Sequence, residues 1–486
     1  MQASIIITFL FWPLPLFPKQ LSQAEAEKFI QTLIHNNKAA TAFVAPEELR
    51  IANRLGISYE GVAQKFFIAY NIEAALREKL KNQIIDYQAT VHHLSKSYAR
   101  LDFKVENADY ARQFFFKNSK LIAPITYYSK NWKTLQSDYF DIFVSDSTLF
   151  NSSCVKYLDN FFESAAHLLQ FNQKQLAAVR REKIRYYLCK DPNEIKQITG
   201  FDARGIYNLA NDAIITIFNA HFHELMHLLV NLKLGKLPLF THPFFQEGFA
   251  VATGGRGGRA VNVVLNLGRF LHQSEMLQYE ELLNKQEFAR VNSSMSYPAS
   301  GLYNAFLLKM MRIDEYLKLY KKYSGTSKEV AAMQIAPQDL PSREALDKFI
   351  QQDCNARAIE PGTPNFAKQP LLFSDSSMKT FEDEQWYYIF LRNNFLFGSE
   401  EKFHDYRSEK FTKLSPGRQY AGEKYWIEAN NNEVSIYNLL TNNLIAGYVS
   451  SFTTSGKQVP REDGFYQFRV AKTVFEEKLT VRIFQK

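Results

Sequence analysis

The stretch from Asn219 to Ala250 reads NAHFHELMHLLVNLKLGKLPLFTHPFFQEGFA, and the expected fold is built around it. Its H-E-x-x-H segment places His223 and His227 four residues apart, so on a helix both imidazoles leave the same face. The preceding β-branched run, residues 213–218, predicts a buried strand. Asn219 is the predicted N-cap of the helix, which we expect to end near Gly235. The helical spacing of Leu225, Leu228, Leu229 and Leu232 predicts its core face. The pattern predicts a strand, a helix, a loop and a second helix.

The side chains of this stretch suit a catalytic metal. Zinc in catalytic sites commonly takes three protein ligands and one water. His223, His227 and Glu247, which follows on the second helix, are the predicted ligands of one Zn²⁺ per chain. Glu224 is turned about 100° around the helix from His223, so we expect it to act as the general base toward the water. The alternative is a core or surface helix whose histidines bind nothing.

These residues resemble the gluzincin zinc metallopeptidases, of the thermolysin and alanyl-aminopeptidase type, also described as peptidase MA-like. In that family H-E-x-x-H is completed by a glutamate on the next helix, often within Asn-Glu-Gly-Phe-Ala; here Gln246 replaces the Asn. The resemblance covers residues 121–326, and its specific part is residues 223–250. It implies a zincin-like catalytic domain and a hydrolase that acts on peptide or protein substrates.

The resemblance also implies a tyrosine on a later helix that hydrogen-bonds the oxyanion of the tetrahedral intermediate. Tyr297, in Ser-Tyr-Pro-Ala-Ser-Gly-Leu-Tyr, is the first candidate and Tyr303 the second. A phenol is a neutral donor suited to a developing negative charge. With 26 tyrosines in the chain, core packing is the alternative for either residue.

One departure from the family bears on specificity. The chain has no Gly-x-Met-Glu-Asn segment ahead of the zinc helix, with which alanyl aminopeptidases hold the substrate amino terminus. An endopeptidase is therefore preferred. Two rival hypotheses remain: a catalytically retired peptidase scaffold that serves as a binding or surface protein, and a metal-dependent hydrolase of a non-peptide amide. His221 and His242 flank the predicted ligands and are left out of the metal shell.

Length and composition bound the other possibilities. The 486 residues suggest about three domains, and 46% hydrophobic with 22% charged residues is ordinary globular composition. The net charge of +8 is spread along the chain, so we expect no nucleic-acid partner.

Residues 4–17 form an uncharged apolar run, and residues 1–26 are predicted to be an export signal, which implies a periplasmic, cell-surface or extracellular protein. No stretch qualifies as a stable membrane span.

The expected fold class is α+β with several domains. Residues 27–118 predict helices packed over an antiparallel sheet, an arrangement that resembles the nuclear-transport-factor cone. A continuous helix is expected over residues 58–81. Residues 119–355 form the predicted gluzincin-like domain, in which Gly205 to Tyr207 is a candidate edge segment for substrate backbone. Residues 364–486 alternate with a period of two and predict a β-rich, sandwich-like accessory domain.

Overall fold

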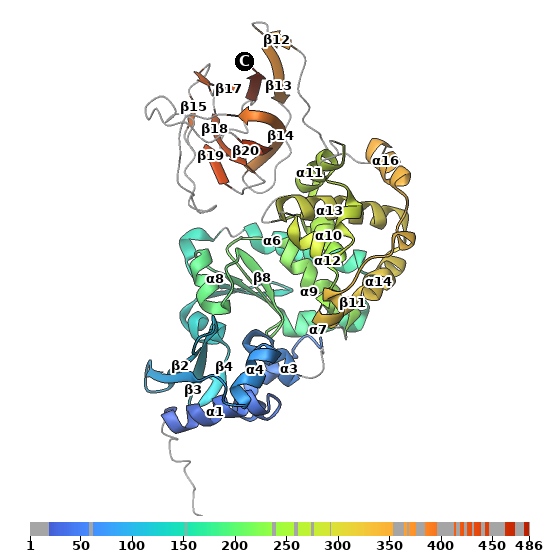
Figure 1. Ribbon diagram of the computed structural model, residues 1–486. Coiled ribbons are helices and arrows are strands. Elements are labelled where there is room, and N and C mark those ends of the chain that lie inside the picture. The colour runs from blue at the N-terminus through green and yellow to red at the C-terminus, as the bar shows by residue number, and fades with distance from the viewer. Residues whose placement is uncertain are drawn as a thin grey trace, which may run out of the picture.

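A computed structural model gives the structure of the chain (Figure 1). It describes residues 19–57, 62–150, 153–235, 240–256, 261–273, 277–291 and 293–352, and beyond these only strands between 364 and 485. The predicted export signal lies for the most part outside the described residues. The first described helix, α1 (Gln23–His35), is closed by a capping box between Ser22 and Glu25. Cleavage after residue 26, where the predicted export signal ends, would fall in the first turn of this helix.

The first layer of the molecule is a four-stranded antiparallel sheet with helices on one face, drawn in blue to cyan in Figure 1. The strands follow chain order: β1 (Tyr87–His93), β2 (Tyr98–Val105), β3 (Ala111–Lys117) and β4 (Lys120–Ile122). Every second residue of β2 from Ala99 to Val105 is buried, as its alternating sequence predicts. The helices are α1, α2 (Pro46–Ile51), α3 (Val62–Phe67) and α4 (Ala74–Lys81).

The expectation of one continuous helix over residues 58–81 is wrong. The chain leaves the helix at Asn71, whose backbone is extended, and α4 begins only at Ala74. A physical reason is the packing of Phe66, Phe67 and Tyr70 as an aromatic cluster against Phe114 of β3. This cluster holds the end of the helix against the sheet, and the chain must then turn to place Leu80 in the same core.

A five-stranded mixed sheet follows, in the order β5-β6-β7-β9-β8. Its strands are β5 (Lys133–Gln136), β6 (Phe140–Val144), β7 (Ile184–Leu188), β9 (Ala213–Thr216) and β8 (Gly205–Asn208). The central three are parallel, and the edge strands β5 and β8 are antiparallel to their neighbours. The same part of the chain contains four helices: α5 (Pro124–Tyr128), α6 (Ser153–Leu168), α7 (Gln173–Glu182) and α8 (Pro192–Thr199).

The two faces of this sheet enter different cores because successive side chains point to opposite sides. Tyr187 and Ile215 pack with the first layer, in the same cluster as Phe29 and Phe114. Tyr186 and Ile214 pack on the other side with α6 and the helices that follow. The mixed sheet therefore separates the N-terminal layer from the helical part of the chain.

The helical part contains the H-E-x-x-H segment. Its helices are α9 (Phe222–Leu234), α10 (Pro243–Gly254), α11 (Val261–Gln273), α12 (Lys285–Arg290), α13 (Ser293–Met310), α14 (Ile313–Lys322), α15 (Ser327–Ala331) and α16 (Arg343–Gln352). A two-stranded ribbon pairs β10 (Phe240–Thr241) with β11 (Ser324–Gly325). Within the described residues, no helix has the length and apolarity needed to cross a membrane.

The strands beyond residue 352 form two five-stranded sheets. One has the order β12 (Pro364–Phe366), β13 (Gln369–Asp375), β21 (Val481–Gln485), β17 (Tyr425–Ala429) and β16 (Arg418–Ala421). The other joins β14 (Glu384–Phe395), β20 (Glu462–Ala471), β18 (Asn432–Asn438) and β15 (Lys413–Leu414), with β19 (Asn443–Ala446) paired to β18. All described pairs are antiparallel, which agrees with the β-rich composition expected for residues 364–486.

Candidate metal centre

Helix α9 carries both histidines of the H-E-x-x-H segment. Its N-cap position is His221, with no side-chain capping bond, so the prediction that Asn219 caps this helix is wrong. Strand β9 ends at Thr216, and the side chain of Thr216 accepts the backbone N–H of Phe218 at 3.1 Å. This local turn occupies residues 217–220 and delays the helix start by two residues. The expected core face, Leu225, Leu228, Leu229 and Leu232, is buried as predicted.

Helix α10 brings the third candidate ligand, Glu247, opposite the two histidines. It starts with Pro243 in its first turn, and the Nδ1 atom of His242 accepts the backbone N–H of Phe244 at 3.2 Å. Gly248 allows α10 to lie close against α13, because a Cβ atom there would stand 2.1 Å from Asn304 Nδ2. Gly248, which directly follows the candidate ligand Glu247, is therefore required for the close packing of α10 against α13.

The three candidate ligand atoms form a compact triangle. His223 Nε2 lies 3.1 Å from Glu247 Oε2 and 3.3 Å from His227 Nε2, and His227 Nε2 lies 3.5 Å from Glu247 Oε2. A tetrahedral ion with bonds of about 2.0–2.1 Å has ligand atoms about 3.3–3.4 Å apart. His223, His227 and Glu247 therefore form a cluster that could hold a metal ion. Their side chains are 6%, 12% and 15% exposed, so the cluster is largely enclosed but keeps some contact with solvent.

A backbone contact fixes the tautomer of His223. Its Nδ1 atom lies 2.9 Å from the carbonyl oxygen of Gly255, and because a carbonyl only accepts, the ring must donate from Nδ1. The Nε2 atom is then the one that carries the lone pair, and it faces Glu247. Orientation of a ligating imidazole by a carbonyl on its far nitrogen is the usual support of a metal-binding histidine.

The charges of the cluster are arranged to keep Glu247 ionised. Burial alone would raise the pKa of Glu247, but the charge of His227 and the close approach of both imidazole rings outweigh it and hold that pKa well below its usual range. Burial would lower the pKa of His227, and the Glu247 carboxylate reverses this and raises it. An ionised carboxylate beside two imidazoles is a donor set with the chemistry of a zinc site.

Glu224 lies beside the cluster and is held by the edge strand of the mixed sheet. Its Oε2 atom accepts the backbone N–H of Tyr207 in β8 at 2.8 Å. Burial raises the pKa of Glu224, and the nearby His227 and His223 partly offset this rise. The contact with Tyr207 leaves the other carboxylate oxygen of Glu224 for a reacting group. Sequence reasoning missed this contact, because no pattern in residues 205–208 points to it.

The two tyrosine candidates occupy different environments. The ring of Tyr297 in α13 lies 6.2 Å from the His223 ring, with an angle of 13° between the planes. Burial, the Glu247 carboxylate and a hydrogen bond to it raise the pKa of Tyr297, so its phenol is a neutral donor at the cluster. Tyr303 is fully buried, and its hydroxyl donates to the carbonyl of Pro341 at 2.6 Å.

The remaining histidines near the cluster have other contacts. The Nδ1 atom of His221 lies 3.0 Å from Thr216 Oγ1, and burial followed by the charges of His223 and His227 lowers the pKa of His221 well below its usual value. His242 caps α10, as described above. Both contacts agree with their omission from the predicted metal shell.

Comparison with protein-family models and with curated proteins gave no match for this chain. The functional argument therefore rests on the residues and their geometry.

Proposed function

We propose that the chain is a zinc-dependent peptidase that hydrolyses peptide bonds, with His223, His227 and Glu247 as metal ligands and Glu224 as the general base. The observation that carries the proposal is the triangle of ligand atoms, with sides of 3.1, 3.3 and 3.5 Å, beside a positioned Glu224. A bound zinc ion would polarise the substrate carbonyl and lower the pKa of a bound water to about 7.

Each residue of the site has a defined task in this proposal. Glu224 takes a proton from the attacking water and gives it to the leaving amine. Tyr297 donates its phenolic hydrogen to the oxyanion of the tetrahedral intermediate. Strand β8 is a free edge of the mixed sheet in the described part of the chain, so a peptide could add to it as a further strand. Its backbone would then lie next to Glu224, which Tyr207 of the same strand holds.

The preference for an endopeptidase follows from the missing amino-terminus clamp, and an exported location follows from residues 1–26. A retired scaffold acting as a binding or surface protein would not need Glu224. The Tyr207 bond that holds Glu224 beside the ligand triangle therefore favours the enzyme.

The first experiment measures bound metal in the full chain after chelation and reloading with zinc. We expect about one zinc per chain, its loss in His223→Ala, and its retention in His242→Asn. The control residue is also a buried histidine near the site, and Asn can still accept the Phe244 N–H. Absence of stoichiometric zinc from the wild-type chain would refute the metal centre.

The second experiment separates the enzyme from the retired scaffold. Glu224→Gln keeps the side-chain shape and an oxygen that can accept the Tyr207 N–H. We expect this variant to retain zinc and to lose roughly a hundredfold or more of its activity on a mixture of internally quenched peptides. Equal cleavage by wild type and variant would rule out Glu224 as the base. A wild-type chain that binds zinc but cleaves no peptide would favour the scaffold.

A further inference from the structure

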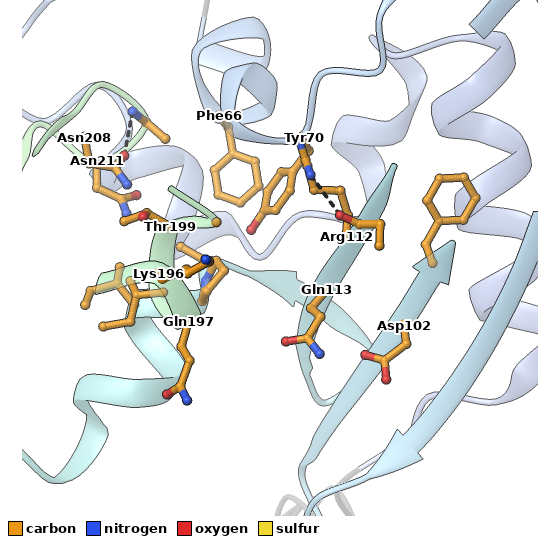
Figure 2. Close-up of a pocket in the computed structure, with 18 of the residues that line it drawn as sticks. Phe66, Tyr70, Asp102, Arg112, Gln113, Lys196, Gln197, Thr199, Asn208 and Asn211 are labelled. Atoms are coloured by element: carbon orange, nitrogen blue, oxygen red, sulfur yellow. Dashed lines mark hydrogen bonds between the residues drawn. The ribbon is translucent and has the colours of Figure 1, made fainter. Parts of the chain in front are cut away.

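The cavity between the N-terminal sheet and the mixed sheet lies away from the candidate metal centre (Figure 2). Its walls include residues of β2, β3, α8 and the turn between β8 and β9, and no candidate metal ligand lines it. Support for the centre from outside the ligand set comes instead from the C-terminal end of α10. The chain there reads Gly254-Gly255-Arg256, and each of these three residues meets a different part of the site.

Gly254, the last residue of α10, allows this helix to end against the start of α9. A Cβ atom on Gly254 would stand 2.6 Å from the carbonyl carbon of Phe222 and 2.7 Å from the backbone nitrogen of His223. Both are backbone atoms, which cannot move aside as the end of a flexible side chain could, so glycine is required. This close approach brings the residues that follow Gly254 next to the candidate ligand His223.

Gly255 turns the chain out of the helix. Its backbone angles are φ 73° and ψ −151°, a combination that is essentially restricted to glycine. In this conformation its carbonyl oxygen lies 2.9 Å from His223 Nδ1. The two glycines therefore fix where Arg256 leaves the backbone relative to the candidate ligands.

Arg256 contacts two residues of α13 that lie one turn apart. Its Nη2 atom donates to Ser293 Oγ at 2.9 Å, and its guanidinium carbon lies 4.6 Å from the centre of the Tyr297 ring. Residues four apart on a helix share a face, so one guanidinium can reach both. A cation over a phenol ring is attracted to the π face, and the bond to Ser293 holds the guanidinium in that place.

Tyr297 in turn touches the ligand cluster. Its ring lies 6.2 Å from the His223 ring, and its phenol hydrogen-bonds Glu247. Arg256 thus places a positive charge on the ring of the residue that contacts two candidate ligands. A positive charge at this point favours negative charge on an oxygen that accepts the phenolic hydrogen.

We propose that Arg256 is a positioning residue for the peptidase reaction. It holds the Tyr297 ring so that the phenol is aimed at the oxyanion, and its charge stabilises the oxyanion through that phenol. This inference rests on the proposed function, because Arg256 is given a task in the same reaction. Arg256 itself does not touch the substrate in this arrangement.

A double-mutant cycle tests the proposal on zinc-loaded full chains: wild type, Arg256→Gln, Tyr297→Phe and the double variant. Tyr297→Phe keeps the ring that Arg256 covers and removes the phenol. On a quenched peptide without acidic side chains, we expect Arg256→Gln to lower kcat roughly tenfold with little change in KM. In the Tyr297→Phe background the same change should lower kcat less than about twofold. Equal effects in both backgrounds, or an effect on KM alone, would mean that Arg256 acts directly on the substrate and would overturn the proposal.

Two further variants control for charge and for arginine loss in general. Arg256→Lys keeps a cation beside the ring and should recover part of the kcat that Arg256→Gln loses. Arg181→Gln removes an exposed arginine of α7, paired with the neighbouring Glu182, and should leave kcat unchanged. An Arg256→Lys variant no more active than Arg256→Gln would contradict a role for the charge.

A readout without catalysis uses the zinc-free chain with fluorotyrosine in place of Tyr297. Fluorine NMR at one fixed pH should show a shifted resonance in Arg256→Gln, because the guanidinium no longer covers the ring. An unchanged resonance would refute the contact. Wild type without zinc or without cleavage would be a failure of the proposed function, and the task of Arg256 would fall with it. An active wild type whose kcat equals that of Arg256→Gln would refute this inference alone.

Discussion

Replacing Lys65 by Met is expected to lower the free energy of unfolding by about 3–5 kcal/mol. Lys65 is on α3 in the N-terminal layer, and its ammonium group donates to Asp212 Oδ1 at 2.5 Å in the turn between β8 and β9. Both side chains are at most 2% exposed. Met fills similar space but leaves the Asp212 carboxylate buried without its cation.

The magnitude follows from the surroundings of Asp212. Burial raises the pKa of Asp212, and the charge and hydrogen bond of Lys65 offset part of that rise. Without Lys65, the remaining donor to Oδ1 is the hydroxyl of Tyr207 at 3.2 Å, and Oδ2 has no partner in the described part of the chain. One neutral hydrogen bond contributes about 1 kcal/mol, which is too little to replace a buried cation.

Chemical denaturation of four chains measures the effect: wild type, Lys65→Met, Asp212→Asn and the double variant. We expect the double variant to be more stable than Lys65→Met, because removing both charges removes the unpaired one. The control is Lys81→Met, whose exposed pair with Glu78 should be worth less than about 1 kcal/mol. A loss below about 1 kcal/mol in Lys65→Met, or strictly additive losses in the double variant, would refute the reasoning.

Three further predictions concern the site and its support. Tyr297→Phe should lower kcat roughly a hundredfold with little change in KM, whereas Tyr303→Phe, which loses a bond to Pro341, should lower only stability in a thermal melt. Gly248→Ala should cost about 1–3 kcal/mol of unfolding free energy in urea titration, because the new Cβ would lie 2.1 Å from Asn304 Nδ2; unchanged stability would show that α10 and α13 can separate. Burial and then the charge of Lys285 lower the pKa of His242 from 6.5 to about 4, so the stability that its neutral form contributes is complete above pH 6.5 and is lost as the pH falls toward 4. Between pH 8 and pH 5 this loss is about 2 kcal/mol. Over the same pH range, the free energy of unfolding of His242→Asn, measured by denaturation, should fall by about 2 kcal/mol less than that of the wild type.

Sequence reasoning located the elements that local patterns specify. The helical periodicity of Leu225, Leu228, Leu229 and Leu232 identified the buried face of α9, and the spacing of His223 and His227 then placed both imidazoles on one side. Such patterns depend only on residues within two turns of one another. They predict an element and its faces without information about the rest of the fold.

The wrong predictions share a physical cause. Contacts made by residues outside the repeating pattern compete with the structure that the pattern predicts. The side chain of Thr216 binds the backbone two residues on and displaces the expected cap at Asn219. Helix α13 begins at Ser293 and includes Pro298 beyond its first turn. A proline beyond the first turn removes one intrahelical N–H bond and disfavours a helix there, so a helix that runs through Pro298 is not expected from the local sequence.

The contacts that give the candidate site its chemistry could not be predicted from the sequence. Tyr207 holds Glu224 through a backbone N–H, which any residue other than proline would offer, so its identity carries no signal. The hydroxyl of the same tyrosine reaches Asp212, whose partner Lys65 lies 147 residues away in the sequence. These bonds form a continuous buried connection from the N-terminal layer to the proposed general base. A damaged N-terminal layer should therefore impair the position of Glu224 before it disturbs the metal ligands, since the ligands lie on α9 and α10 and His223 is oriented by the carbonyl of Gly255 at the end of α10.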